Sequence, residues 1–266
     1  MFTGTPYFGN PVAVVLGADG LSTEQMQLFA RWTNLSETTF VLAPRASGAD
    51  YLVRIFTPTG ELPFAGHPTL GTCHAWLEAG GRASDPDAVV QECAAGLVTV
   101  RKTEAGLAFA APPLVRSGPV EEPVAERVAR ALNLARSDIV DIAWADNGPG
   151  WVAVLLDSAE AVLKLRPGAV EMDIGVVGPY PDGSPEALEV RAFSPQITSV
   201  EDPVTGSLNA SLGQWLLGSG RVGAPYVASQ GTAMGRRGRV HVSQDADGQV
   251  WVGGGTVTCV SGTVEL

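Results

Sequence analysis

Cysteine is scarce in this sequence: Cys73, Cys93 and Cys259 are the only three among 266 residues. They form no CxxC pair and show no spacing typical of a zinc site, so we expect no bound metal. Unpaired cysteines of this kind are typical of proteins in a reducing compartment. The sequence therefore predicts a cytoplasmic protein.

Positive charge is scarce as well, with 17 lysines and arginines against 28 acidic residues and a formal net charge of −11. Phosphate binding requires a basic surface, which makes nucleic acid a poor partner. The basic cluster at residues 236–239 is flanked by glycines and is expected to cap a solvated hairpin. No apolar run approaches the ~20 residues that a membrane helix needs, and no charged-then-apolar leader is visible, so we expect no membrane association.

Glycine and proline, in contrast, are abundant, with 32 and 19 residues, and 45% of the chain is hydrophobic. This composition favours a globular fold of short strands and many turns over a helix bundle. The length permits one large or two medium domains. Prolines between Pro112 and Pro123 mark the expected boundary, which gives lobes at residues 1–112 and 113–266, with the last strand able to cross back to the first lobe.

Local patterns predict the individual elements. Ser22 and Gln25 form a capping-box pattern at a helix start, in which each side chain bonds the backbone N–H of the other residue. A polar-faced helix is expected at residues 124–132. Segments rich in β-branched and aromatic residues predict strands at 11–16, 38–42, 51–56, 88–93, 97–101, 107–110, 151–156 and 188–193, with further short strands after residue 226.

Two further helices are unusually apolar and begin in a similar way. One is expected to start at about Pro68, after Gly66, and the other at about Ser207, after Gly206. Helices that are hydrophobic on most sides are buried. The sequence therefore predicts an α+β fold of two similar lobes, each a curved, mainly antiparallel sheet wrapped around a central apolar helix, with the active cleft between the lobes. Chance similarity of two apolar helices is the alternative.

Three titratable residues occupy positions suited to chemistry. Glu37 lies between a helix end and a strand start, which is a good place for a general base. His67 lies where a helix begins, beside a glycine, and this position favours ligand contact. Asp202 precedes Pro203 in extended or turn geometry and is a second candidate acid. Each residue has an ordinary alternative: a solvated loop carboxylate, a satisfied loop histidine or a plain turn residue.

A joint pattern of five segments spans nearly the whole chain. The segments are residues 9–14 (GNPVAV), 34–40 (NLSETTF), 55–58 (IFTP), 61–69 (ELPFAGHPT) and 201–207 (EDPVTGS). In this order they resemble the PhzF phenazine-biosynthesis family. The resemblance implies a diaminopimelate-epimerase-like fold, a homodimer and an isomerase that uses no cofactor.

The resemblance also implies roles for particular residues. The catalytic glutamate of the family falls on Glu37, its cleft histidine on His67 and its second carboxylate on Asp202. Its substrate-binding positions fall on Ser36, Gly66, Gly206 and Ser207. Related racemases use two cysteines, one before each central helix. The corresponding places are expected at Ala65 and within residues 202–204, and neither holds a cysteine, so two-cysteine racemisation is not expected.

We therefore expect a cofactor-independent isomerase that transfers a proton between carbons of a small unsaturated metabolite bearing a carboxylate. The helix starts would bind the carboxylate through their unpaired N–H groups, and Glu37 would move the proton. A non-catalytic, two-lobed small-molecule binding protein is the main alternative. A protein that only binds carboxylates would gain nothing from the like charge of Glu37 beside the binding site, and this repulsion is unfavourable unless Glu37 takes part in catalysis. A serine hydrolase that uses Ser207, His67 and Asp202 is less favoured, because the sequence has no G-x-S-x-G elbow.

Overall fold

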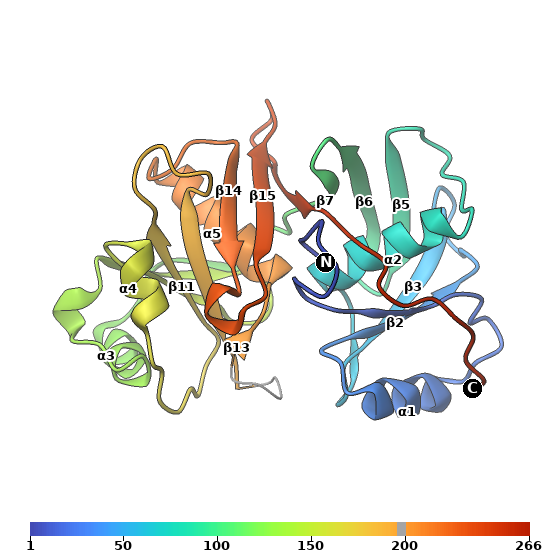
Figure 1. Cartoon of the computed structure of the whole chain (residues 1–266), viewed down its shortest axis with the longest axis horizontal. Helices are drawn as coiled ribbons and strands as arrows, with labels where there is room; N and C mark the ends of the chain where they lie inside the picture. Colours follow the sequence, from blue (N-terminus) through green and yellow to red (C-terminus); the bar gives the residue numbers. More distant parts are fainter. Residues whose placement is uncertain (196–200) are drawn as a thin grey trace. The chain divides into compact units, whose positions relative to one another are not determined.

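A computed structural model describes residues 1–195 and 201–266 of the chain. It divides into two compact units: unit 1 contains residues 1–110 and 253–266, and unit 2 contains residues 111–252. The chain leaves unit 1 close to the boundary expected at residues 112 and 113, and its last residues return to unit 1 (Figure 1).

Unit 1 is a mixed sheet with two helices. Its strands are hydrogen-bonded in the order β1-β2-β3-β5-β6-β7, and β4 pairs with β3. The pairs β1–β2 and β3–β5 are parallel, and the other pairs of this unit are antiparallel. The bounds are β1 Ala13–Val15, α1 Thr23–Thr33, β2 Thr38–Leu42, β3 Tyr51–Phe56, β4 Glu61–Leu62, α2 Gly66–Glu78, β5 Ala88–Cys93, β6 Gly96–Thr103 and β7 Gly106–Ala110.

Helix α2 is the central helix of unit 1, and Figure 1 shows it running across the strands. All of its residues from Gly66 to Cys73 are buried, as expected for a helix that is apolar on most sides. Helix α1, in contrast, is amphipathic, and it packs Met26 and Ala30 on the aromatic side chains of β2 and β3. The sheet is thus covered by one buried helix and one surface helix.

Unit 2 has the strand order β16-β15-β14-β12-β11-β10-β9-β8, with β13 paired to β12. Strand β16 begins in unit 2 and ends in unit 1. The bounds are β8 Arg116–Pro119, α3 Glu122–Ala131, η1 Arg136–Asp138, β9 Asp141–Asp146, β10 Val152–Leu155, α4 Ala159–Lys164, β11 Ile174–Pro179, β12 Leu188–Phe193, β13 Glu201–Asp202, α5 Gly206–Gly218, β14 Tyr226–Gln230, η2 Thr232–Met234, β15 Gly238–Gln244 and β16 Val250–Gly254.

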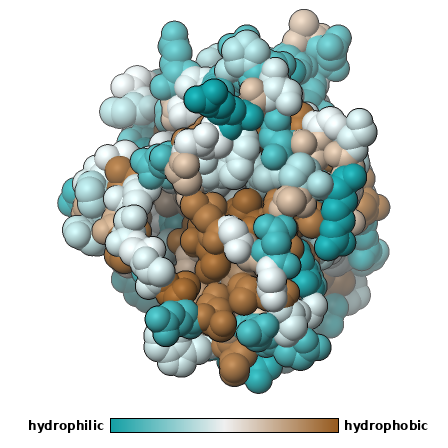
Figure 2. All heavy atoms as spheres, turned by 90° about the vertical axis from the view of Figure 1, so that its right-hand side faces the viewer, coloured by the Kyte–Doolittle hydropathy of each residue, from teal (hydrophilic) through white to brown (hydrophobic). Residues whose placement is uncertain are grey.

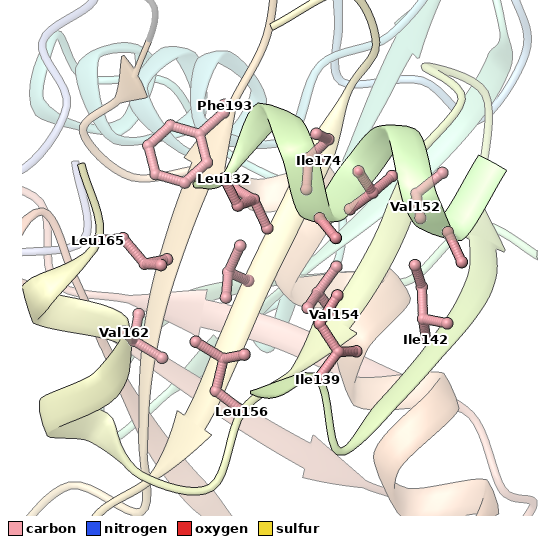
Figure 3. Packing of buried hydrophobic residues seen from close by; sticks show 14 residues of the cluster. Leu132, Ile139, Ile142, Val152, Val154, Leu156, Val162, Leu165, Ile174 and Phe193 are labelled. Atoms are coloured by element: carbon pink, nitrogen blue, oxygen red, sulfur yellow. The ribbon is translucent and has the colours of Figure 1, made fainter. Parts of the chain in front are cut away.

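The sheet of unit 2 is covered on both faces. Figure 3 shows the cluster on one face, where Val152, Val154 and Ile174 pack beneath α3 and near α4. Side chains alternate along a strand, so Gly175 faces the other way, and a Cβ atom at this position would meet the side chain of Leu208 in α5. Helix α5 is therefore the central helix of unit 2, on the face opposite to α3 and α4.

The two units repeat one strand ladder. In each unit a first strand pairs in parallel with a second, the second pairs antiparallel with a third, and the third pairs with a short strand that leads into the central helix. The successive partners are Ala13, Thr38, Phe56 and Glu61 in unit 1 and Val152, Ile174, Phe193 and Glu201 in unit 2. Both central helices have 13 residues and begin at a glycine. The predicted duplication and α+β fold are confirmed, and chance similarity is wrong.

Several predicted elements have the expected bounds, among them β2, β3, β5 and β12. The capping box is confirmed: Gln25 N–H donates to Ser22 Oγ at 3.2 Å, and Ser22 N–H donates to Gln25 Oε1 at 2.9 Å. The central helices begin slightly earlier than predicted, at Gly66 and Gly206. In α2 the first turn accommodates Pro68. The basic cluster leads from the β14–β15 connection into β15. No helix in the described ranges is long and apolar enough to cross a membrane.

Candidate active site

Glu37 occupies the short connection between α1 and β2. Helix α1 ends at Thr33, and its C-cap Asn34 adopts the left-handed backbone conformation (φ 55°) that commonly ends a helix. Strand β2 begins at Thr38. Glu37 is therefore fixed between a capped helix end and a hydrogen-bonded strand, which restricts where its carboxylate can point.

The carboxylate of Glu37 lies against the imidazole of His67, the second residue of α2. Glu37 Oε2 is 3.0 Å from His67 Nε2, and the two side chains are 16% and 6% exposed. Both atoms are buried, and neither is aligned for a hydrogen bond with any group in residues 1–195 and 201–266. The two groups are thus within the distance of an ion pair, and each keeps hydrogen-bonding capacity for a ligand.

Asn10 contacts the other side of the same imidazole. Its Nδ2 lies 3.5 Å from His67 Nδ1, and both residues are buried. With the Asn10 amide nitrogen as the donor, Nδ1 is the acceptor, and a neutral imidazole then carries its proton on Nε2; the donor and acceptor roles at this contact depend on the tautomer of His67. In this tautomer the proton is on the ring nitrogen that lies 3.0 Å from Glu37 Oε2, and the two groups are not aligned for a hydrogen bond with each other.

Neither central helix has a side-chain cap within the described part of the chain. The N-cap residue is Ala65 in α2 and Thr205 in α5, and neither side chain bonds a backbone N–H of its helix. The first N–H groups of a helix have no partner inside the helix and lie at the positive end of its dipole. Gly66 in α2 and Gly206 and Ser207 in α5 therefore present donors that suit a carboxylate.

Asp202 reaches the start of α5 from the end of β13. Its neighbour Glu201 forms an ion pair with Arg191 of β12 (Oε2 to NH2, 2.7 Å). Since adjacent strand residues point to opposite faces, Asp202 points the other way, and its Oδ2 accepts a hydrogen bond of 2.6 Å from Thr205 Oγ1. The carboxylate of Asp202 is thereby placed beside the N-cap of the central helix of unit 2.

The side chain of Gln230, at the end of β14, forms hydrogen bonds with several groups around the start of α5. Its Oε1 accepts from the Thr205 N–H at 3.0 Å and from Asn209 Nδ2 at 2.7 Å. Its Nε2 donates to Thr205 Oγ1 at 2.9 Å and to the Asp202 carbonyl at 3.2 Å. One buried amide therefore joins β13, the N-cap and the second turn of α5.

Ser207, the second residue of α5, is held by the turn before β10. Trp151 Nε1–H donates to Ser207 Oγ at 3.1 Å, and Asn147 Nδ2–H donates to the Ser207 carbonyl at 3.0 Å. The carboxylate of Asp146 fixes this turn by accepting from the N–H groups of Gly148 and Gly150, both at 2.7 Å. Because the indole occupies a lone pair of the serine hydroxyl, the hydroxyl proton is left for another acceptor.

The residue at the start of each central helix is not a cysteine. The repeated ladder equates the N-cap residues Ala65 and Thr205. Residues 202–204, where the second cysteine position is expected, directly precede Thr205 and contain no cysteine. Cys73 is buried one to two turns into α2, and burial raises the pKa of its thiol to about 12. A thiol of this kind is a core side chain, not a nucleophile.

The structure brings Glu37 and His67 together in unit 1, and it gathers Asp202, Gly206 and Ser207 at the start of α5 in unit 2. Ser36 lies beside Glu37 and is partly exposed. Sequence reasoning gave no role to the residues that hold these groups, namely Asn10, Asn147, Trp151, Thr205, Asn209 and Gln230. No group of three or more His, Cys, Asp or Glu side chains in the described ranges is arranged to hold a metal ion.

Comparison with known proteins gives a consistent result. A family model described as phenazine biosynthesis-like protein (PhzC-PhzF) matches residues 1–262. Antisense-enhancing sequence 1 of Schizosaccharomyces pombe is 36% identical over 98% of this chain and 95% of its own length. The trans-2,3-dihydro-3-hydroxyanthranilate isomerase of Pseudomonas chlororaphis is 36% identical over 100% of this chain and 97% of its own. The crystal structure of a PhzF-family phenazine biosynthesis protein from Bacillus anthracis superimposes with a TM-score of 0.79, at 25% identity, over 94% of this chain and 92% of that one.

The duplicated α+β fold is that of PhzF-family proteins, and the relatives of this chain with assigned reactions are named isomerases. The chain belongs to the PhzC-PhzF family of phenazine biosynthesis-like proteins. The resemblance to this family is thereby confirmed.

Proposed function

We propose that this isomerase moves a proton between two carbons of a small unsaturated metabolite that bears a carboxylate, and that it needs no cofactor. The observation that carries the proposal is the buried pair of Glu37 and His67, whose Oε2 and Nε2 atoms are 3.0 Å apart. Carboxylates and imidazoles are the groups most often used for general acid–base catalysis. Both are supplied by the chain itself, which supports a proton transfer that uses no cofactor.

In the proposed reaction, Glu37 acts as the base that removes a proton from one carbon and returns it to another on the same face of the substrate. His67 directs its Nε2–H into the site and stabilises charge that develops during the transfer. General acid–base catalysis by one residue contributes roughly 10²–10⁴-fold to the rate. The rest of the rate enhancement must come from positioning the substrate.

The substrate carboxylate would be bound by backbone N–H groups at an uncapped helix start, and the proposed contacts are Gly66 of α2 and Gly206 and Ser207 of α5. Asp202 would accept a hydrogen bond from a polar N–H or O–H of the same molecule, since a carboxylate only accepts. Ser36, next to Glu37, is proposed as a further contact. These assignments support a substrate that combines a carboxylate with a neighbouring donor group.

Deuterium incorporation tests the proposal directly. Proton NMR spectra would be recorded in deuterated buffer with trans-2,3-dihydro-3-hydroxyanthranilate, the compound named for the P. chlororaphis relative, and with a small panel of cyclic unsaturated acids. We expect the wild type to introduce deuterium at carbon and Glu37→Gln to do so at least about 100-fold more slowly. Glu104→Gln, which alters an exposed carboxylate of the same unit, serves as the matched control and should retain the wild-type rate.

Near-normal turnover by Glu37→Gln on an accepted substrate would show that the base is misassigned. Substrate-dependent chemical shift changes without exchange in the wild type would favour the alternative of a non-catalytic binding protein. The hydrolase alternative gains no support, because the Ser207 hydroxyl accepts from an indole N–H and no base is hydrogen-bonded to it within residues 1–195 and 201–266. Labelling of Ser207 by an active-serine phosphonate would reverse that view.

We further propose that the protein is a cytoplasmic homodimer. All three cysteines are free thiols, which is typical of a reducing compartment. Helix α1 supports the dimer: Leu28 and Trp32 are 65% and 78% exposed, and Phe29 stacks on Trp32 with ring centroids 6.1 Å apart. Figure 2 shows hydrophobic side chains gathered on the face of unit 1 that lies on the right in Figure 1. Grouped exposed apolar side chains mark interaction surfaces.

A further inference from the structure

The side chain of Thr205, the N-cap residue of α5, does not cap its helix. Threonine is favoured at this position because its hydroxyl accepts a hydrogen bond from an N–H of the first turn. The Thr205 side chain forms no such bond with α5 in the described residues, and its Oγ1 donates to Asp202 Oδ2 at 2.6 Å instead. The hydroxyl is thus turned from the helix to the carboxylate, and the first-turn N–H groups stay open.

Gln230 explains why the hydroxyl is turned this way. The end of its amide that faces the Thr205 N–H and Asn209 Nδ2 meets two donors and must therefore be the oxygen. The other end is then the nitrogen, and it lies 2.9 Å from Thr205 Oγ1. An amide nitrogen only donates, so it occupies a lone pair of the hydroxyl, and the hydroxyl proton is directed to Asp202.

The members of this chain of hydrogen bonds are held rigidly. Gln230 is fully buried, Asn209 is 1% exposed and Thr205 is 7% exposed. Hydrogen bonds in such surroundings are stronger than in water, and breaking one leaves a buried polar group unpaired. The direction of donation from Gln230 through Thr205 to Asp202 is therefore a fixed property of the fold.

We propose that Gln230 is a positioning residue of the active site: through the Thr205 hydroxyl it holds Asp202 as an acceptor, and it keeps the first N–H groups of α5 open for the substrate. The role of Gln230 in the reaction rests on the proposed function, whereas the hydrogen bonds from Gln230 through Thr205 to Asp202 can be measured without any substrate. An experiment can therefore refute the hydrogen-bond chain and the proposed function separately.

Unit 1 contains a similar amide that lacks this role. Gln91 of β5 is fully buried, its Nε2 donates to Thr69 Oγ1 at 3.0 Å, and its Oε1 accepts from Tyr51 OH at 3.0 Å. Thr69 lies one turn inside α2, and the N-cap of that helix is Ala65, which has no hydroxyl. Gln91 is therefore a matched control for the removal of a buried glutamine that touches a threonine.

The test is a pH titration of the Asp202 carboxyl by carbon-13 NMR, with its signal assigned by Asp202→Asn. A hydrogen bond to the charged form of a carboxyl lowers its pKa. Thr205→Val is expected to raise the pKa of Asp202 by about one pH unit, while Thr205→Ser keeps the hydroxyl and leaves the titration unchanged. The charged groups on the strands beside Asp202, which are Glu189, Arg191 and Glu201, are the same in every variant.

Gln230→Met tests the first step of the chain. It should raise the pKa of Asp202 in the same direction as Thr205→Val, and the double variant should titrate like Thr205→Val alone, because the two residues act in series. Gln91→Met should leave the Asp202 titration unchanged. If Gln230→Met does not fold, the pair Thr205→Ser and Thr205→Val still decides whether the hydroxyl holds Asp202.

The proposal is overturned if Thr205→Val titrates like the wild type, or if the effects of Thr205→Val and Gln230→Met simply add. With a substrate that shows deuterium exchange, Thr205→Val should lower kcat or raise KM, and Thr205→Ser should restore the wild-type value. A shift in the titration without any change in exchange would retain the hydrogen-bond chain and remove its role in the reaction.

Discussion

Glu189 is a buried carboxylate that the proposed chemistry does not use. Its Oε2 accepts from Tyr180 OH at 2.7 Å and from Thr232 Oγ1 at 3.1 Å. Its Oε1 is buried and has no hydrogen-bond partner among the residues that the structure describes. Burial raises the pKa of Glu189 above its usual value of 4.5, and burial beside this carboxylate raises the pKa of Tyr180 to about 12.

A raised pKa of Glu189 makes stability depend on pH. The folded state binds the proton more tightly than the unfolded state, so this contribution is fully present below about pH 4.5 and is lost as pH rises through the folded-state pKa. Glu189→Gln is uncharged at every pH. It is expected to raise the free energy of unfolding relative to the wild type by about 1 kcal/mol at pH 8, and by much less at pH 4.

Urea denaturation of wild type and Glu189→Gln at the two pH values measures this difference. Glu104→Gln, at an exposed carboxylate, should show no such pH dependence. An equal effect of Glu189→Gln at pH 4 and pH 8 would mean that the ionisation of Glu189 is not what limits stability.

Individual site residues could be predicted from the sequence where their role depends on their neighbours in the chain. Glu37 and His67 were found because a helix end, a strand start and a helix start are visible from local pattern. Gln230 was not, because its role depends on Thr205, 25 residues away, across the fold. A lone buried glutamine in a strand has no signal that distinguishes it from any other polar residue.

Among the elements, each short strand that leads into a central helix carries a glutamate that pairs with an arginine of the neighbouring strand, and the two pairs differ in burial. Arg54 binds Glu61 with contacts of 2.8 and 2.6 Å, and Arg191 binds Glu201 with contacts of 2.9 and 2.7 Å. The side chains of the first pair are 23% and 34% exposed, and those of the second are 5% and 15% exposed. Arg191 also donates to two carbonyls at the end of α4.

Replacing the arginine of each pair should therefore have unequal effects. Arg191→Met removes one member of an ion pair whose side chains are only 5% and 15% exposed, together with two further hydrogen bonds, and it is expected to cost about 3–5 kcal/mol. Arg54→Met removes a solvent-screened pair and should cost about 0–1 kcal/mol. Chemical denaturation of the two variants at neutral pH measures both values, and similar losses would contradict the role assigned to burial.

The elements that the sequence predicted well are those with strong β-branched or capping signals, such as β2, β3 and α1. Helix α4 and strand β11 were missed. Helix α4 spans only Ala159–Lys164, and β11 contains Gly175 and Gly178, which lower strand propensity. Both glycines have a tertiary reason: a Cβ atom would meet Leu208 at one and the Ser158 carbonyl at the other. Such close approaches are not readable from local sequence.

For the whole molecule, the exposed apolar side chains of α1 lead to a prediction about assembly. If a second copy covers α1, Trp32→Asp should convert the dimer to a monomer, because burying an unpaired carboxylate in an apolar interface is unfavourable. Val140→Asp, at a side chain of unit 2 that is 58% exposed, is the matched control and should leave the assembly unchanged. Sedimentation velocity over a range of concentrations distinguishes the two outcomes, and a monomeric wild type would refute the homodimer.

The overall architecture was predictable because the same local pattern precedes the central helix of each unit: a titratable residue, a glycine and a small hydroxyl residue. The ladder that relates the units was not, since strand order and register depend on pairings between distant segments. The return of residues 253–266 to unit 1 was expected only as an option for the last strand. Nothing in the local composition of that segment distinguishes the two units.

This return has a consequence for how the protein is made. Gly255 accepts a hydrogen bond of 2.9 Å from the Thr3 N–H, and Gly253 packs on Leu107, so unit 1 is completed by residues that the ribosome adds after the whole of unit 2. At translation rates of about 5–20 residues per second, the intervening segment takes roughly 7–28 s to synthesise. During that time β7 lacks its neighbour β16, and an unpaired strand edge invites aggregation. Unit 1, which is translated first, is therefore completed only after unit 2 has been synthesised.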